Sequence, residues 1–162
     1  MSRSISISKD HATMLLRVAL GLVFIAHAGA KWFTFTLPGT VEFFASQGFP
    51  GWSAYPVFAA ELVGGIALVL GLGTRWVALT LVPVMLGALT VHWPNGWTFT
   101  APDGGWEYVA FLTVALLVQA GLGDGAMALG SYVRGAGATG LNLDHGSPES
   151  QSAHADRGRK AA

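Results

Sequence analysis

The chain has 162 residues and a net charge of zero, and only 11% of its residues are charged. Soluble globular domains carry about 25% charged residues, so this sequence lacks the side chains that would solvate a globular surface. The balanced charge argues against a basic nucleic-acid-binding surface, and the absence of cysteine excludes disulfides and thiolate-held iron–sulfur clusters within the chain. Only eight of the eighteen Asp, Glu, Lys and Arg residues lie between positions 12 and 131, which is the composition of a membrane protein.

Four apolar runs follow one another along this middle segment. A hydrocarbon core of about 30 Å requires about 20 apolar residues in a helix that rises 1.5 Å per residue. The runs predict helices at about residues 12–30, 55–73, 76–92 and 106–129. The sequence therefore predicts an all-α fold, an integral membrane bundle of four transmembrane helices over residues 12–130.

The connections between these helices alternate in character. Gly73-Thr74-Arg75 is short and predicts that the second and third helices form an antiparallel pair. The connection over residues 31–54 is long and aromatic, and Pro38 and Gly48 bracket a predicted short helix. Its aromatic side chains favour a position in the membrane interface, with an ordinary loop as the alternative. The flanking residues 1–11 and 131–162 are predicted to be tails, the second one disordered because it has little to bury.

The Lys and Arg residues divide unequally between the two sides of this predicted bundle. Lys31 alone lies on one side. The other side holds Arg3, Lys9, Arg75, Arg134, Arg157, Arg159 and Lys160. The positive-inside rule then places both termini in the cytoplasm of a multi-pass inner-membrane protein. An alternative starts from the basic N-terminus and Ala28-Gly29-Ala30, which together have the form of a cleavable signal peptide; its removal would leave three helices in the same orientation.

Ionisable side chains within membrane helices are costly, so each one here is a candidate functional residue. The predicted topology places five of them in the outer half of the bundle: His27, Lys31, Glu61, His92 and Glu107. Arg17 precedes His27 by ten residues and is therefore predicted to lie about 15 Å deeper. Trp93 and Tyr108 are predicted to form apolar walls of a binding site. A lone carboxylate in hydrocarbon needs a partner, so we expect Glu61 to face at least one of Arg17, His27, Lys31 and His92.

Five of these six ionisable residues, all except His27, also have a structural explanation. Lys31 and Arg17 can extend their charged ends to the lipid headgroups, and Glu107 can complement the dipole at the start of its helix. His92 can be an interfacial residue, and Glu61 can form a purely structural ion pair. A metal site is not predicted, because no helix carries a Glu-x-x-His or His-x-x-x-His spacing.

Several segments together resemble the DoxX family of small four-helix membrane proteins. They are LLRVALGLVFIAHAGAKW at residues 15–32, FFASQGFPG at 43–51, AAELVGGIALVLGLGTRW at 59–76, and HWPNGW with GGWEYVAFL within 92–112. The resemblance covers about residues 14–130. By position, the characteristic polar residues of the family correspond to Arg17, Lys31, Glu61, Arg75 and Glu107.

The resemblance implies a membrane component of a redox system. The family is similar to DoxD, a membrane subunit of thiosulfate:quinone oxidoreductases, and other members are linked to oxidative-stress complexes. On this hypothesis the polar cluster binds a quinone, and the chain is an oxidoreductase subunit beside a partner redox subunit or a second copy of itself. Two other functions stay open: a non-catalytic membrane anchor for a partner protein, and a small proton-coupled transporter that uses Glu61.

Overall fold

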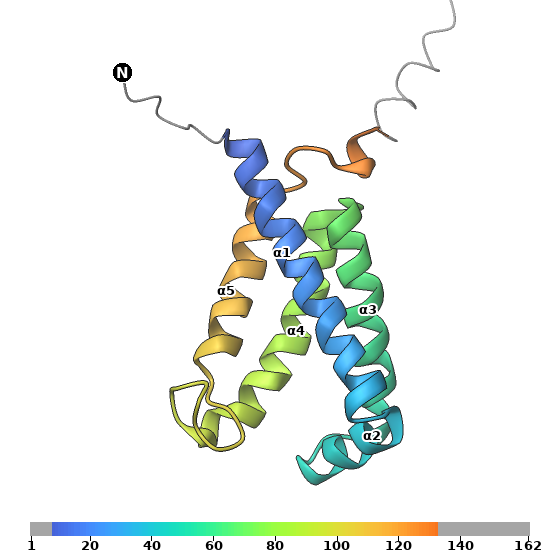
Figure 1. Cartoon of the computed structure of the whole chain (residues 1–162), viewed down its shortest axis with the longest axis vertical. Helices are drawn as coiled ribbons and strands as arrows, with labels where there is room; N and C mark the ends of the chain where they lie inside the picture. The colour runs from blue at the N-terminus through green and yellow to red at the C-terminus, as the bar shows by residue number, and fades with distance from the viewer. Residues whose placement is uncertain (1–7, 133–162) are drawn as a thin grey trace, which may run out of the picture. The chain divides into compact units, whose positions relative to one another are not determined.

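The computed structural model describes residues 8–132, and over this part of the chain the fold is all-α, as predicted. Short helical turns connect five α-helices, and the turn at Ala30–Thr34 is π-helical. The α-helices are α1 (Lys9–Gly29), α2 (Leu37–Ser46), α3 (Ala54–Leu70), α4 (Thr74–His92) and α5 (Glu107–Leu122) (Figure 1). The other residues, 1–7 and 133–162, include most of the two predicted tails and lie outside this description.

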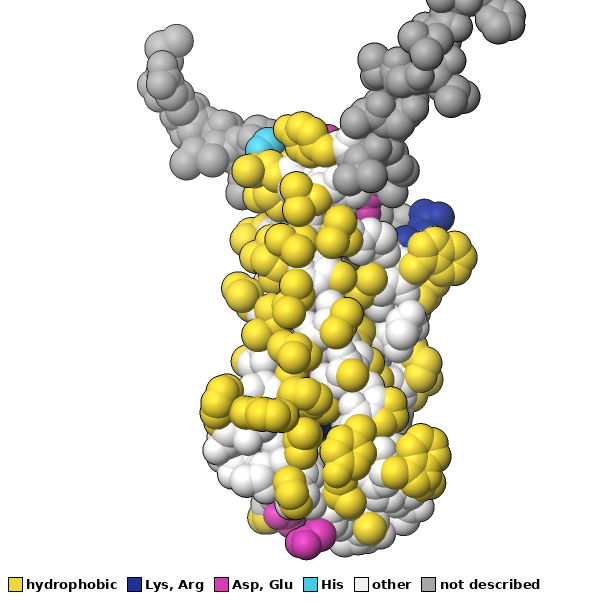
Figure 2. Space-filling view, turned by 90° about the vertical axis from the view of Figure 1, so that its right-hand side faces the viewer, with side chains coloured by type: hydrophobic (Ala, Val, Ile, Leu, Met, Phe, Trp, Pro, Cys, Tyr) yellow, Lys and Arg dark blue, Asp and Glu magenta, His cyan; other side chains and the backbone are white. Residues whose placement is uncertain are grey.

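Three helical stretches are long and apolar enough to cross a membrane, and α5 is a shorter apolar helix of 16 residues. The three stretches are Lys9–Thr34, Gly51–Leu70 and Thr74–Asn95. This pattern is that of a membrane helical bundle. One face of the molecule carries mostly hydrophobic side chains along its length, with the charged side chains gathered mainly near its two ends (Figure 2).

Local sequence signals set the ends of these helices. The Ser8 side chain accepts a hydrogen bond from a backbone N–H of the first turn of α1, and this N-cap starts the helix three residues before the predicted position. Thr36 caps α2 in the same way, accepting from the Gly39 N–H at 3.3 Å, so the predicted short helix is confirmed. Gly71 ends α3 with a left-handed φ of 70°, a conformation that glycine adopts without steric cost.

The prediction that the last helix extends to residue 129 is wrong, because α5 ends at Leu122. Gly123, Gly125 and Met127 all have positive φ, and a right-handed helix cannot pass through such residues. The chain instead crosses the end of the bundle. The Ala126 N–H donates to the carbonyl of Asp10, and further on a backbone N–H donates to the Gly71 carbonyl. We call residues 123–130 the closing segment.

The bundle is organised as two helix pairs, with α1 packed mainly along α3 and α5 mainly along α4 (Figure 1). The first pair is close because Gly21 and Gly65 meet at the crossing. A Cβ atom added to Gly21 would lie 2.7 Å from the Gly65 carbonyl oxygen, and one added to Gly65 would lie 2.8 Å from the Gly21 oxygen. Small residues allow this approach of two membrane helices. The core between the pairs is formed by apolar side chains that include Leu20, Phe24, Leu68, Leu81, Met85, Leu112 and Leu116.

Candidate functional site

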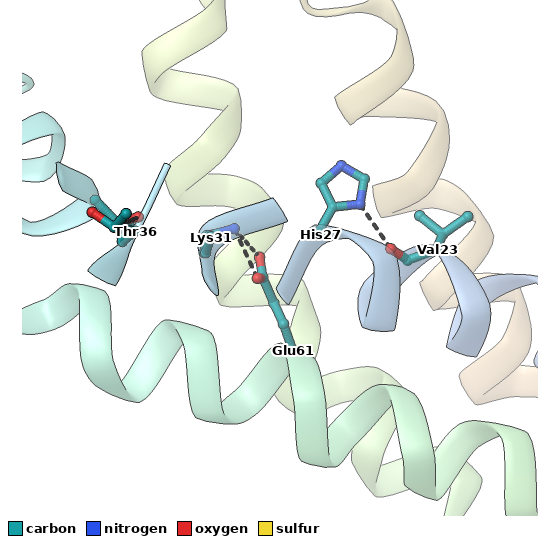
Figure 3. A network of polar contacts seen from close by, with 6 residues as sticks. Val23, His27, Lys31, Thr36 and Glu61 are labelled. Atoms are coloured by element: carbon teal, nitrogen blue, oxygen red, sulfur yellow. Dashed lines mark hydrogen bonds and ion pairs between the residues drawn. The ribbon is translucent and has the colours of Figure 1, made fainter. Parts of the chain in front are cut away.

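The strongest polar contact joins α3 to the end of the first helical stretch (Figure 3). The Lys31 Nζ lies 2.7 Å from Glu61 Oε2 and 2.9 Å from Glu61 Oε1. The two side chains are 17% and 6% exposed, respectively. The expectation that Glu61 faces a cationic group is therefore met, and Lys31 is that group.

Two backbone features place this pair. Lys31 lies in the π-helical turn Ala30–Thr34, which holds one more residue per hydrogen-bonded ring than an α-helical turn and so rotates the side chains that follow α1. Glu61 lies in the second turn of α3, four residues before Gly65, on the stripe that approaches α1. The sequence indicated the glycine but not the π-helical turn, which carries no residue signature here.

His27 forms a separate contact with Tyr108. The His27 Nδ1 lies 2.8 Å from the Val23 carbonyl oxygen (Figure 3). Its ring stacks on the ring of Tyr108, with centroids 6.2 Å apart and planes inclined by 17°. Both residues are exposed on the surface of the bundle. Tyr108 therefore lies beside one residue of the predicted cluster, and that residue is His27.

His92 and Glu107 instead order the loop between α4 and α5. The His92 Nδ1 lies 3.0 Å from the Gly104 carbonyl oxygen, and Glu107 Oε1 accepts a hydrogen bond of 2.9 Å from the Phe99 N–H. Trp93, the other predicted wall, stacks on Trp106 at a centroid distance of 4.8 Å. These contacts join parts of the α4–α5 connection to one another and to the helix ends beside it.

Arg17 lies at the opposite end of the bundle, beside the closing segment. Its side chain is 1% exposed, and Nη2 donates to the carbonyls of Ala126 and Met127 at 3.3 and 3.4 Å. The carboxylate of Asp124 also acts on it electrostatically. The guanidinium does not extend to the surface, because the closing segment covers it. Asp124 was not among the predicted residues.

The predicted five-residue cluster is thus only partly assembled. Hydrogen bonds and ion pairs join Lys31 to Glu61, while His27, His92 and Glu107 have other partners. The prediction of one convergent cluster rested on helix levels alone, and levels do not determine where a side chain finds its partner. In the described part of the chain, no three His, Asp or Glu side chains are grouped so that they could hold a metal ion.

Comparison with known proteins supports part of this picture. Residues 12–93 match the DoxX family, a segment that includes Arg17, Lys31 and Glu61. The resemblance noted for residues 104–112, with Glu107, lies beyond this match. A protein of Bacillus subtilis (strain 168) named "Putative oxidoreductase CatD" is 38% identical over 82 residues, which make up 51% of this chain and 60% of that protein. No solved structure matches the chain.

The family match covers half of the chain and all of the three long apolar helices except their outermost residues. The relative named above is matched over less than two thirds of its own length, so its name describes that protein and not this one. The apolar helices and the family membership both indicate a membrane protein. The chain is a multi-pass membrane protein and belongs to the DoxX family.

Proposed function

We propose that this protein is the membrane component of a quinone-linked redox system and that the Lys31–Glu61 pair is the centre of its site. The observation that carries the proposal is an ion pair in a membrane helical bundle, in which the Glu61 carboxylate is buried and the Lys31 ammonium is largely covered. Stability alone is a weak reason for such a pair, because well-packed apolar residues in its place are often as stable or more so. A role in binding or proton transfer explains why both charges are present.

The chemistry of the pair fits a quinone headgroup. The Lys31 ammonium has three N–H donors, and two of its contacts are the two oxygens of Glu61. The third donor can bind a quinone carbonyl, and the Glu61 carboxylate can accept a proton. A quinone supplies two-electron, two-proton chemistry when it is bound. The name of the Bacillus subtilis relative also points to oxidoreductase chemistry, and a partner redox subunit, with or without a second copy of this chain, would deliver the electrons.

The proposal includes a topology of four membrane-spanning helices with both termini in the cytoplasm. Lys9 and Arg75 begin α1 and α4 at the end of the bundle that carries the closing segment, whereas Lys31 lies at the other end. The positive-inside rule assigns the first end to the cytoplasm. At 1.5 Å per residue α5 is about 24 Å long, which requires slight local thinning of the bilayer. We place α2 in the outer interface, with Phe43 exposed.

Cysteine labelling tests this orientation. Pro102→Cys in the loop before α5 should react with a membrane-impermeant maleimide added to intact cells, and Leu72→Cys in the α3–α4 turn should react only after lysis. Both positions are exposed, whereas Thr74 in the same turn is fully buried and would be a poor site for labelling. Reaction of Leu72→Cys in intact cells would show that the true orientation is the reverse of the proposed one.

A charge-removing substitution tests the proposed function. Glu61→Gln keeps one acceptor oxygen for Lys31 and removes the charge, so we expect a folded protein that retains less quinone. The measurement is mass spectrometry of small molecules and proteins that co-purify with the gently solubilised chain. Glu42→Gln on α2 is the matched control, because Glu42 is exposed.

Two outcomes would contradict this proposal. Quinone that is absent from the wild-type protein, together with a stoichiometric partner, would favour the membrane anchor. If Glu61→Gln and Glu42→Gln retained equal amounts of quinone, the ion pair would not be part of the quinone site.

A further inference from the structure

We propose that His27 and Tyr108 form a docking point, open to the bilayer, for an aromatic hydroxyl of the hydroquinone type. This inference rests on the proposed function in that it supplies the entry point of the same carrier. It concerns a different pair of residues and a different redox state of the ligand, the reduced hydroquinone. The observations that carry it are the stacked rings of the two residues, their exposure and the hydrogen bond of His27.

The hydrogen bond of His27 fixes which ring nitrogen is free. Nδ1 lies 2.8 Å from the Val23 carbonyl oxygen, and a carbonyl can only accept, so Nδ1 carries the proton. In the neutral imidazole, Nε2 then has a lone pair and is an acceptor. Within residues 8–132 no side chain or backbone group donates to this nitrogen. His27 therefore presents an unused acceptor at the surface of a membrane helix.

Tyr108 supplies the second polar atom and the aromatic surface. It is 41% exposed, and its hydroxyl has no hydrogen-bond partner in the described part of the chain. The neighbouring surface on α5 is apolar, since Phe111, one turn further along the helix, is 69% exposed. His27 is in the last turn of α1 and Tyr108 is in the first turn of α5. In the proposed topology this exposed surface faces the outer part of the bilayer, where a lipid-soluble ligand can reach it.

The ligand class follows from these groups. It must dissolve in lipid, donate a hydrogen bond to His27 Nε2 and offer a flat ring to the stacked pair. A hydroquinone meets all three conditions, and it can also accept a hydrogen bond from the Tyr108 hydroxyl. The oxidised quinone can accept from the Tyr108 hydroxyl but has no donor for Nε2, so it forms one hydrogen bond fewer. The site therefore prefers the reduced carrier, while the ammonium of Lys31, four residues after His27, suits the carbonyl of the oxidised one.

Nitrogen NMR tests this docking point in the full chain. The protein is labelled with 15N-histidine and placed in nanodiscs of phosphatidylcholine, whose headgroup has no hydrogen-bond donor. A decyl-tailed benzohydroquinone should move the Nε2 signal of His27, which the His27→Phe variant identifies. His92 is the internal control, because a backbone carbonyl engages its Nδ1 in the same way but it ends α4 and contacts the loop. His27→Phe has no signal of its own at this position, so its binding is followed by the ring signals of 13C-labelled Tyr108; the hydroquinone concentration that half-saturates their shift should rise about five-fold, the loss of one neutral hydrogen bond.

Three results would overturn the inference. The first is an equal shift of the His27 signal by the dimethyl ether of the same molecule, which has no donor. The second is a shift of the His92 signal alone by the hydroquinone. The third is a shift of the His27 signal by phosphatidylglycerol alone, whose headgroup has hydroxyls, that is as large as the shift by the hydroquinone; the occupant would then be a lipid. None of these results affects the co-purification test at Glu61. Conversely, a hydroquinone-specific shift at His27 would stand even if Glu61→Gln retained all of its quinone.

Discussion

Gly71→Ala should be among the most destabilising single substitutions in this protein. A Cβ atom at this position would overlap the Nη1 atom of Arg17 and would lie 2.7 Å from the Cβ of Ala128. The residue also has a φ of 70°, which costs an L-residue with a side chain about 1–2 kcal/mol. Arg17 cannot move away freely, because it is buried and bonded to the closing segment. With overpacking adding about 1–3 kcal/mol, we expect a total loss of roughly 3 kcal/mol in the free energy of unfolding.

Gly73→Ala is the matched control for this substitution. Gly73 has a φ of 57°, and a Cβ atom there would meet nothing within 4 Å. It therefore carries the backbone cost of about 1–2 kcal/mol without the overlap. Both free energies of unfolding can be measured by titration with sodium dodecyl sulfate in mixed micelles. Equal losses in the two variants would show that Arg17 does not occupy the position against Gly71.

Removal of Lys31 should have a comparable effect at the other end of the bundle. Lys31→Met leaves the Glu61 carboxylate buried with no cation, and breaking a buried pair in this way costs about 3–5 kcal/mol. The double variant Lys31→Met, Glu61→Leu removes both charges and should recover most of the loss. The same unfolding titration measures the four free energies of the double-mutant cycle. Losses that simply add would mean that the two side chains do not interact.

The apolar runs were sufficient to predict the helices, because apolar length is what a membrane span requires. The predicted starts at residues 55, 76 and 106 differ from those of α3, α4 and α5 by one or two residues. The end of α5 could not be predicted in the same way. Apolar residues continue to Leu129, and glycine is common inside membrane helices, which favoured a longer helix. Gly123-Asp124-Gly125 contains an Asp-Gly turn signal, and this signal, rather than the apolar pattern, corresponds to the observed end.

The candidate site was only partly predictable for a related reason. The cost of a lone carboxylate predicted that Glu61 would have a cationic partner, and the pair with Lys31 meets that expectation. The partners of His27, His92 and Arg17 are backbone carbonyls. Every residue has a carbonyl, so the sequence does not mark which one a side chain will use. The conformation of the loop or closing segment decides it, and that conformation depends on tertiary packing.

The closing segment has a consequence for how the protein is made. Arg17 leaves the ribosome 109 residues before Ala126, its first carbonyl partner. At a synthesis rate of about 5–20 residues per second, the delay is roughly 5–20 s. During this time the nascent first helix must hold an unpartnered guanidinium, which favours a shallower position with the charge among headgroups. The final depth of that helix is therefore settled only when the last part of the bundle emerges.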